Sequence, residues 1–366
     1  MPHEIWYMRG SAWLPNGREG MIMVDIEQFN VQLEALGKAL AHARRVLITA
    51  PGAADGDSIG SQLALRRMIE LRFPQIEIRI INDEPLPERY RFLPEVENVD
   101  TPESYAKLNG DLQFDLGFIV DGGLDRAGRV REVFERCPAT VFVDHHAISA
   151  EYPYTIRLVE PRASATTELI YHISQSPGFA TPVSPNFAQQ IYLGLIFDTG
   201  FFRHSNTTPE VMELAAKLLR TGFDFTRVGE RGMLERTFTS LKLLSDTLSR
   251  ANLSLDGKII WSKLTQETLR AFNAADDDRE GIIDHLFLTH GIEVAVLFFE
   301  LPGKQTKISL RSQGKLDVAA FARSLTERGG GHQKAAGANL ELSIDQAEPW
   351  VLQRLQAQLT GQAGKY

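Results

Sequence analysis

The chain has 366 residues, of which 43% are apolar and 23% are charged, as is usual for a globular protein with two domains. Its net charge is -8 and no long basic run occurs, which argues against tight binding of long DNA by charge alone. No apolar stretch approaches the roughly 20 residues that span a membrane, and the single cysteine excludes an internal disulfide framework, so we expect a cytoplasmic protein.

Strand and helix patterns alternate through the first 200 residues. They follow a start that lacks the apolar centre of a signal peptide, and we expect residues 1–23 to form a disordered extension. Short apolar runs predict strands at RVLITA (45–50), IEIRII (76–81), FDLGFIVD (114–121) and ATVFVD (139–144). Helical patterns lie at 58–71, 127–136 and 164–176. Because strands that alternate with helices form parallel sheets, we expect an α/β fold with helices on both faces of a parallel sheet.

A different pattern follows residue 205. TPEVMELAAKLLRTG (208–222) has the Thr-Pro-Glu start and the Gly stop of a helix, and the sequence stays helical to residue 250. Beyond it we expect strands and helices in the segments 251–264, 279–290, 292–301, 306–312 and 317–325. The predicted organisation is a first domain over 24–205, a helical linker over 206–250 and a smaller α/β domain over 251–362, with a cleft between the two domains.

Acidic and imidazole side chains gather where the predicted strands end. They are Asp55, Asp57, Asp121, Asp144, His145 and His146, and Asp198 follows an apolar helical run. Ligands of open parallel sheets bind beyond the carboxyl ends of the strands. Carboxylates in one place repel one another unless a divalent cation is present, and oxygen and imidazole ligands without a thiolate favour manganese, magnesium or iron. Two ions that share a carboxylate would polarise a phosphate and activate a water.

Each of these residues also has a purely structural explanation. Asp55, Asp57 or Asp198 could cap a helix, and a histidine at a strand end is more often part of the core or the surface than a ligand. Asp121, which precedes two glycines, could belong to a turn. Independent caps and turns need not converge on one sheet edge, however, so the combined pattern favours a metal site.

The second domain contains RGGGHQKAAGA, from Arg328 to Ala338. Three glycines followed by small residues that we expect to begin a helix predict a backbone nest for an anion. Arg311 in SLRS is a candidate for binding a phosphate or a base. The alternatives are a flexible glycine turn and a solvated arginine on a strand.

Six motifs, in this order, carry a resemblance to a known family: DGDSIGS, VDGG, VDHH, FDTGFFRHSNTTPE, SLRS and GGGHQKAAGA. Over residues 24–360 the chain resembles the DHH phosphoesterase family, in the branch with a DHH-associated C-terminal domain. In size and layout it is similar to the nanoRNases, oligoribonucleases that also act on 3′-phosphoadenosine 5′-phosphate. The resemblance implies that residues 24–205 form the catalytic domain and residues 251–362 the substrate-binding domain.

The resemblance also implies a site with two manganese ions. Asp55 and Asp121 would bind the first ion, and the second would be bound by Asp57, Asp121, His145 and Asp198. The implied catalytic residues are His146, which would contact the scissile phosphate, Asp144, which would orient its neighbours, and Asp57. The implied substrate-binding residues are Arg311, Ser312, Gly329, Gly330, Gly331 and His332.

One position departs from the family pattern. The family has a histidine four residues before the first aspartate of its first motif, and this chain has Pro51 there. A ligand of the first ion is therefore missing, and the neighbouring alanines and glycine offer no side-chain nitrogen. We expect the first site to be weak, to fill only with substrate bound, or to be completed by water. His204 is the nearest alternative by motif, although nothing in the sequence places it there.

The leading functional hypothesis is a metal-dependent phosphodiesterase that hydrolyses short oligoribonucleotides or linear dinucleotides such as pGpG or pApA to mononucleotides. A second is hydrolysis of cyclic dinucleotides or of 3′-phosphoadenosine 5′-phosphate. A hypothesis of another class, supported only by Pro51, is a nucleotide-binding regulator with impaired catalysis. GGGHQKAAGA argues against the related manganese pyrophosphatases, which have a different second domain. The sequence leaves a homodimer open.

Overall fold

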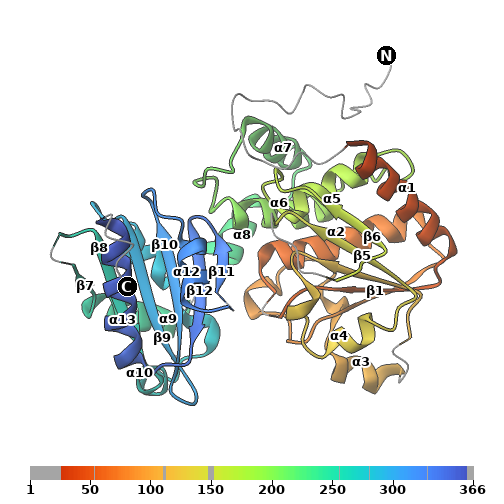
Figure 1. Cartoon of the computed structure of the whole chain (residues 1–366). Helices are drawn as coiled ribbons and strands as arrows, with labels where there is room; N and C mark the ends of the chain where they lie inside the picture. The colour runs from red at the N-terminus through yellow and green to blue at the C-terminus, as the bar shows by residue number, and fades with distance from the viewer. Residues whose placement is uncertain are drawn as a thin grey trace. The chain divides into compact units, whose positions relative to one another are not determined.

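The computed structural model describes residues 26–52, 54–109, 113–146, 152–254, 256–279, 281–327 and 329–360. The extension expected over residues 1–23 lies outside the described residues. The chain divides into two compact units, Met1–Glu235 and Arg236–Tyr366 (Figure 1). Among the described residues, no helix combines the length and the apolar character that crossing a membrane requires.

The first unit is built on a parallel sheet, as predicted. In spatial order its described strands are β3 (Val99–Asp100), β2 (Glu77–Ile81), β1 (Arg45–Thr49), β4 (Leu116–Val120), β5 (Ala139–Asp144) and β6 (Ile156–Val159). β1 lies inside the sheet and pairs in parallel with β2 and β4, and β4 pairs in parallel with β5. The ends of β1, β4 and β5, where the acidic motifs begin, therefore lie at one edge of the sheet.

Helices cover both faces of this sheet, which confirms the predicted fold class (Figure 1). Side chains of a strand alternate between the faces, so Val46 and Ile48 of β1 pack in one core cluster and Leu47 in another. The first cluster includes residues of α1 (Ile26–His42), α2 (Gly56–Arg72), α5 (Thr166–Gln175) and α6 (Pro185–Asp198). The second includes residues of α3 (Pro102–Asn109) and α4 (Val130–Phe134).

Shorter elements complete the first unit. They are η1 (Glu88–Tyr90), η2 (Val96–Asn98), η3 (Leu124–Arg126), α7 (Pro209–Leu219), α8 (Phe225–Gly229) and the π-helical turn η4 (Glu230–Leu234). Buried Val211 and Leu218 place α7 in the core cluster that also contains α6. The segment 206–250, expected as a helical linker, is thus helical and divided between the units, because α7, α8 and η4 belong to the first and α9 (Phe238–Ser249) to the second.

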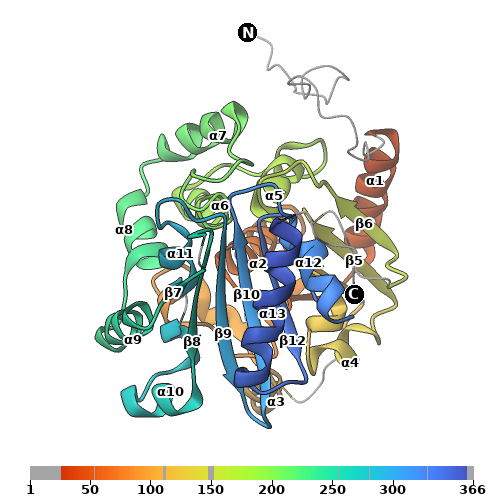
Figure 2. The ribbon, with the colours of Figure 1, turned by 60° about the vertical axis from the view of Figure 1, so that its left-hand side comes forward.

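The second unit contains a mixed sheet with helices on both faces (Figure 2). In spatial order its described strands are β11 (Gly330–His332), β12 (Ala335–Leu340), β10 (Gln305–Ser312), β9 (Val294–Leu301), β8 (Ile259–Leu264) and β7 (Asn252–Leu253). β8 and β9 are parallel and the other neighbours antiparallel. One face packs against α12 (Val318–Leu325) and α13 (Ile344–Leu359), and the other against α9, α10 (Gln266–Phe272) and α11 (Ile282–Phe287); η5 spans Asp276–Arg279.

The helix expected after the three glycines of GGGHQKAAGA is wrong. Ala335–Leu340 forms β12, which pairs antiparallel with both β10 and β11. Ala336, Ala338 and Leu340 alternate onto the buried face of the sheet, so tertiary pairing decides the conformation of a run of small residues that has no strong local preference. The helix N-terminus on which the predicted nest was based therefore does not exist.

Candidate metal centre

Four side chains from separate parts of the first unit come together at the sheet edge. Asp57 lies in the first turn of α2, Asp121 directly follows β4, His145 directly follows β5, and Asp198 ends α6. One ligand atom from each lies within 4.8 Å of those of the other three, and we call these four residues the metal group. Asp57, Asp121 and His145 are buried and Asp198 is half-buried. A set of three carboxylates and one imidazole without a thiolate fits a hard divalent cation.

The two aspartates of DGDSIGS have different positions. Asp55 is the N-cap of α2, and its Oδ1 accepts hydrogen bonds of 3.0 Å from the backbone amides of Asp57 and Ser58. The capping explanation thus holds for Asp55, which lies outside the metal group. Asp57 is fully buried, and its two oxygens accept from the amides of Thr166 (2.6 Å) and Thr167 (2.9 Å). The first turn of α5 therefore fixes the orientation of Asp57.

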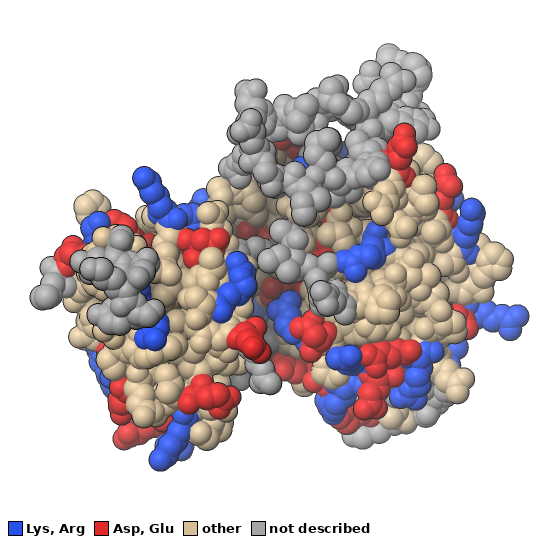
Figure 3. Space-filling view, in the orientation of Figure 1, with Lys and Arg blue, Asp and Glu red and all other residues tan. Residues whose placement is uncertain are grey.

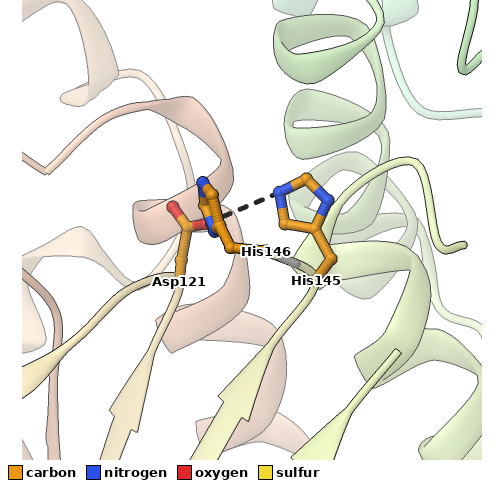
Figure 4. A group of neighbouring side chains, drawn as sticks. All are labelled: Asp121, His145 and His146. Atoms are coloured by element: carbon orange, nitrogen blue, oxygen red, sulfur yellow. Dashed lines mark ion pairs between the residues drawn. The ribbon is translucent and has the colours of Figure 1, made fainter. Parts of the chain in front are cut away.

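Asp121 has a positive φ of 61°, a conformation that costs energy for a residue with a side chain. Its Oδ2 accepts a 2.5 Å hydrogen bond from the Ser58 hydroxyl, and its Oδ1 accepts one of 3.2 Å from the Thr166 hydroxyl. Asp121 also forms a second group of ligand atoms with His145 and His146 (Figure 4). Its carboxylate is the one acidic group common to both groups among the described residues.

The two histidines of VDHH point different ring nitrogens at their neighbours. His145 Nδ1 lies 3.2 Å from the Ala163 carbonyl, which requires a proton on Nδ1 and leaves Nε2 to face Asp198 Oδ2 at 2.9 Å. His146 Nδ1 lies 2.7 Å from Asp144 Oδ1. This same oxygen accepts from the backbone amides of His145 (2.8 Å) and His146 (3.2 Å). One oxygen of the buried Asp144 carboxylate therefore holds the backbone of both histidines and the ring of His146.

An unusual left-handed turn follows Asp198. Gly200, Phe201 and Phe202 have φ values of 55°, 63° and 62°, although side chains as bulky as phenylalanine rarely adopt this region. The Asp198 carbonyl accepts a hydrogen bond from Asn206 Nδ2 at 3.2 Å. His204 Nδ1 lies 3.1 Å from the same carbonyl, so its contact is with the backbone of Asp198 and not with the metal group.

Burial and mutual repulsion change the proton affinities at this edge. Burial and the charge of Asp121 raise the pKa of Asp55 to about 7, and burial and the charge of Asp57 raise the pKa of Asp121 to about 6. Burial and Asp57 also raise the pKa of Asp198 well above its usual value. Burial lowers the pKa of His145, but the hydrogen bond and charge of Asp198 outweigh burial and raise it. A cation at the metal group would replace protons that otherwise offset this negative charge.

Several residues that contact the metal group are not among the predicted site residues. Ser58 lies within DGDSIGS, and its hydroxyl directly beside Asp57 is a local signal for a contact with an acidic residue. Asn206 lies within FDTGFFRHSNTTPE and Thr166 and Thr167 lie outside the six motifs, and none of the three has a local signal for a contact with an acidic residue. Pro51, where the family has a histidine, offers no ligand atom.

The substrate-binding residues predicted in the second unit all lie on or next to the strands of its sheet. Arg311 Nε lies 3.0 Å from Asp284 Oδ1, and Ser312 is buried. A Cβ on Gly329 would overlap the Ala322 carbonyl, and on Gly331 it would lie 2.5 Å from the Ala335 carbonyl. Close packing therefore explains these two glycines. Gly330 pairs with Gly337, and His332 ends β11.

Comparisons with known proteins agree with these motifs. The DHH family, N-terminal domain, matches residues 45–195, and the DHHA1 domain matches residues 257–361. The chain is 29% identical over 309 residues to the bifunctional oligoribonuclease and PAP phosphatase NrnA of Thermus thermophilus, covering 84% of this chain and 87% of that protein. It is 24% identical over 339 residues to the cyclic-di-AMP phosphodiesterase PdeA of Listeria monocytogenes, covering 90% of this chain and 50% of that protein.

A solved structure extends the comparison to the fold. An exopolyphosphatase-related protein from Bacteroides fragilis superposes with a TM-score of 0.81 at 22% identity, covering 90% of this chain and 98% of that one. At this identity the likeness shows the fold alone. The two matching domains, in the order that the motifs predict, show that this chain belongs to the DHH phosphoesterase family and carries a DHHA1 domain.

Proposed function

We propose that this chain is a divalent-metal-dependent phosphodiesterase that hydrolyses short oligoribonucleotides or linear dinucleotides such as pGpG or pApA to mononucleotides. The observation that carries the proposal is the metal group of Asp57, Asp121, His145 and Asp198 at the carboxyl edge of a parallel sheet. Hydrogen bonds from Ser58 and Thr166 hold the carboxylates of Asp121 and Asp57, and the Ala163 carbonyl holds the ring of His145.

The residues of the metal group would hold a divalent ion, and we propose manganese. When bound, such an ion supplies polarisation of a phosphate and activation of water. We further propose that Asp55 and Asp121 hold another ion, the first ion of the family pattern, only weakly. Two features support a weak first site: Asp55 Oδ1 already caps α2, and Pro51 offers no ligand atom.

His146 is suited to contact the scissile phosphate. Its side chain is 30% exposed, whereas that of His145 is 8% exposed, so the substrate can reach it. Burial lowers the pKa of His146, but the hydrogen bond and charge of Asp144 raise it above the usual value. A protonated His146, held by Asp144 through Nδ1, would donate a hydrogen bond to a phosphate oxygen through Nε2.

We propose that the second unit binds the end of the substrate that lies away from the scissile phosphate. Arg311 would bind a phosphate or a base. Ser312, the glycines 329–331 and His332 would also bind the substrate. Arg311 is paired with Asp284, whose side chain is 47% exposed, so a phosphate in solvent can compete for the guanidinium. Charged residues of both signs lie side by side on the visible face of each unit (Figure 3), which supports a short substrate over long nucleic acid.

Two other activities have support from named relatives. NrnA relatives are described as PAP phosphatases and PdeA as a cyclic-di-AMP phosphodiesterase. Hydrolysis of 3′-phosphoadenosine 5′-phosphate or of cyclic dinucleotides is therefore the second candidate. A catalytically impaired nucleotide-binding regulator is the candidate of another class, since Pro51 removes one ligand. The cytoplasmic location and the homodimer stay predictions.

Turnover of a defined substrate panel tests the proposal. The panel holds pGpG, pApA, pApG, a 5-mer RNA, cyclic dinucleotides and 3′-phosphoadenosine 5′-phosphate, each with manganese, magnesium, cobalt or iron. We expect mononucleotide release from the linear dinucleotides with manganese, loss of release in Asp57→Asn, and unchanged release in Glu213→Gln on the exposed side of α7. Nucleotide binding without turnover in every combination would instead support the regulator.

A further inference from the structure

We propose that Arg126 binds a phosphate group of the substrate beside the metal group. The proposal rests on the proposed function, because it assigns a phosphate to this edge of the sheet. Arg126 is the last residue of η3, a short turn that follows β4 and Asp121. Sequence motifs gave no reason to select it.

The Arg126 guanidinium lies directly against the backbone that carries Asp121. A Cβ built on Gly122, the next residue, would lie 2.5 Å from Arg126 Nη2 and 2.8 Å from Pro51 Cγ. Gly122 has a φ of 125°, a conformation that side chains rarely adopt, and its missing side chain provides the space in which the guanidinium lies. The Arg126 carbonyl also accepts a 2.7 Å hydrogen bond from the Gly52 amide, which ties η3 to the loop after β1.

The Arg126 side chain is exposed and makes no hydrogen bond or ion pair within the part of the chain that the structure describes. Arg129, three residues later, differs, because its guanidinium pairs with Asp83 at 2.5 Å and with Glu103. The guanidinium of Arg129 is thus held by two carboxylates, whereas that of Arg126 has no partner among the described residues. Arg129 stabilises the surface of the first unit, whereas the donors of Arg126 are available to a ligand.

Phosphate is the ligand that this position fits. A guanidinium presents paired N–H donors that match two oxygens of a phosphate, and it stays charged at every physiological pH. The two side chains closest to a Cβ built on Gly122 are those of Pro51 and Arg126. Pro51 has no polar side-chain atom, so the positive charge beside Gly122 comes from Arg126. A phosphate at the metal group would be close in the chain to Arg126, because Gly122, against which the guanidinium lies, directly follows Asp121.

Calorimetric titration with AMP and with adenosine, in the presence of manganese, tests the assignment. We expect Arg126→Ala to weaken AMP binding about tenfold or more, because a charge-assisted hydrogen bond is lost, and to leave adenosine binding and manganese binding unchanged. Arg126→Lys should retain part of the AMP affinity. Arg129→Ala is the matched control and should bind AMP as the parent does, with melting curves to confirm that each variant is folded.

Equal AMP affinity in Arg126→Ala and the parent would overturn the inference, and so would failure of the folded parent to bind AMP. The outcome is separable from that of the proposed function. A chain that hydrolyses none of the panel but loses AMP affinity in Arg126→Ala keeps the phosphate site and loses the proposed activity. A chain that hydrolyses dinucleotides equally well with and without Arg126 keeps the activity and loses the phosphate site.

Discussion

His145 Nε2 and Asp198 Oδ2 lie 2.9 Å apart, although the two residues are the start of a loop after β5 and the end of α6. The other ring nitrogen of His145 is held by the Ala163 carbonyl, so the tautomer that presents Nε2 is set by the protein. An imidazole fixed in this way is a typical metal ligand. The pair thus joins a strand end and a helix end into one coordination site.

Removal of the His145 imidazole should remove most of the affinity for manganese. In His145→Ala, three carboxylates remain without the nitrogen that Ala163 orients, and we expect the manganese Kd to rise at least about 100-fold. Titration of the folded, metal-stripped protein followed by electron paramagnetic resonance measures this directly. His172→Ala, on α5 and outside the metal group, is the control. Retained affinity in His145→Ala would show that the metal group is not the binding site.

Manganese affinity should fall as the pH is lowered. The pKa of Asp121 is raised to about 6 by burial and by the charge of Asp57, so below about pH 6 a proton must leave before the cation binds. Asp198 and His145 also have raised pKa values and would have to lose protons as well, so the apparent Kd should rise as the pH is lowered, by about tenfold per pH unit for each proton displaced. Titrations between about pH 5 and pH 8 check this, and an affinity independent of pH would contradict it.

Replacement of Asp144 should affect turnover and not metal binding. Asp144→Asn keeps the shape but removes the charge that holds His146 Nδ1 and raises its pKa. We expect kcat to fall about 10- to 100-fold, with the manganese Kd nearly unchanged. If protonated His146 acts on the phosphate, the loss of activity on raising the pH should begin at lower pH in the variant. An unchanged pH profile would exclude this role for His146.

Replacement of Asn206 should lower both the stability of the protein and its affinity for manganese, because Asn206 holds the backbone of Asp198. Its amide donates to the carbonyls of Ser164 (3.0 Å) and Asp198 (3.2 Å), so Asn206→Ala leaves two carbonyls with one donor fewer. We expect a loss of about 1–3 kcal/mol in the free energy of unfolding and a manganese Kd raised about tenfold. Asn98→Ala, which removes one amide bond to the Glu95 carbonyl, is the matched control. Equal manganese affinity in both variants would limit Asn206 to a role in folding.

A histidine at position 51 should add a metal ion. The parent chain, with Pro51, is expected to bind one manganese ion tightly, and Pro51→His would supply the nitrogen that the family pattern has at this place. Counting bound manganese after gel filtration should give one ion for the parent and two for the variant. Two tightly bound ions in the parent would show that water or another residue completes the first site.

The sequence by itself determined the parallel sheet and the edge at which the site lies. Short apolar runs in β1, β4 and β5 identify buried strands. Asp121 and His145 directly follow β4 and β5, and Asp57 lies in the motif that follows β1, so local patterns and the geometry of parallel sheets were enough. The same reasoning predicted the N-cap as an alternative for Asp55, which the structure bears out, because capping depends only on residues two or three positions apart.

Tertiary structure alone decided what surrounds these residues. Asp57 accepts hydrogen bonds from Thr166 and Thr167, more than 100 residues later, and no local pattern encodes which helix will pack on α2. The segment after the three glycines became β12 rather than a helix because β10 and β11 were available to pair with it. Such contacts depend on the packing of distant elements, and small residues that tolerate several conformations take the one that the packing selects.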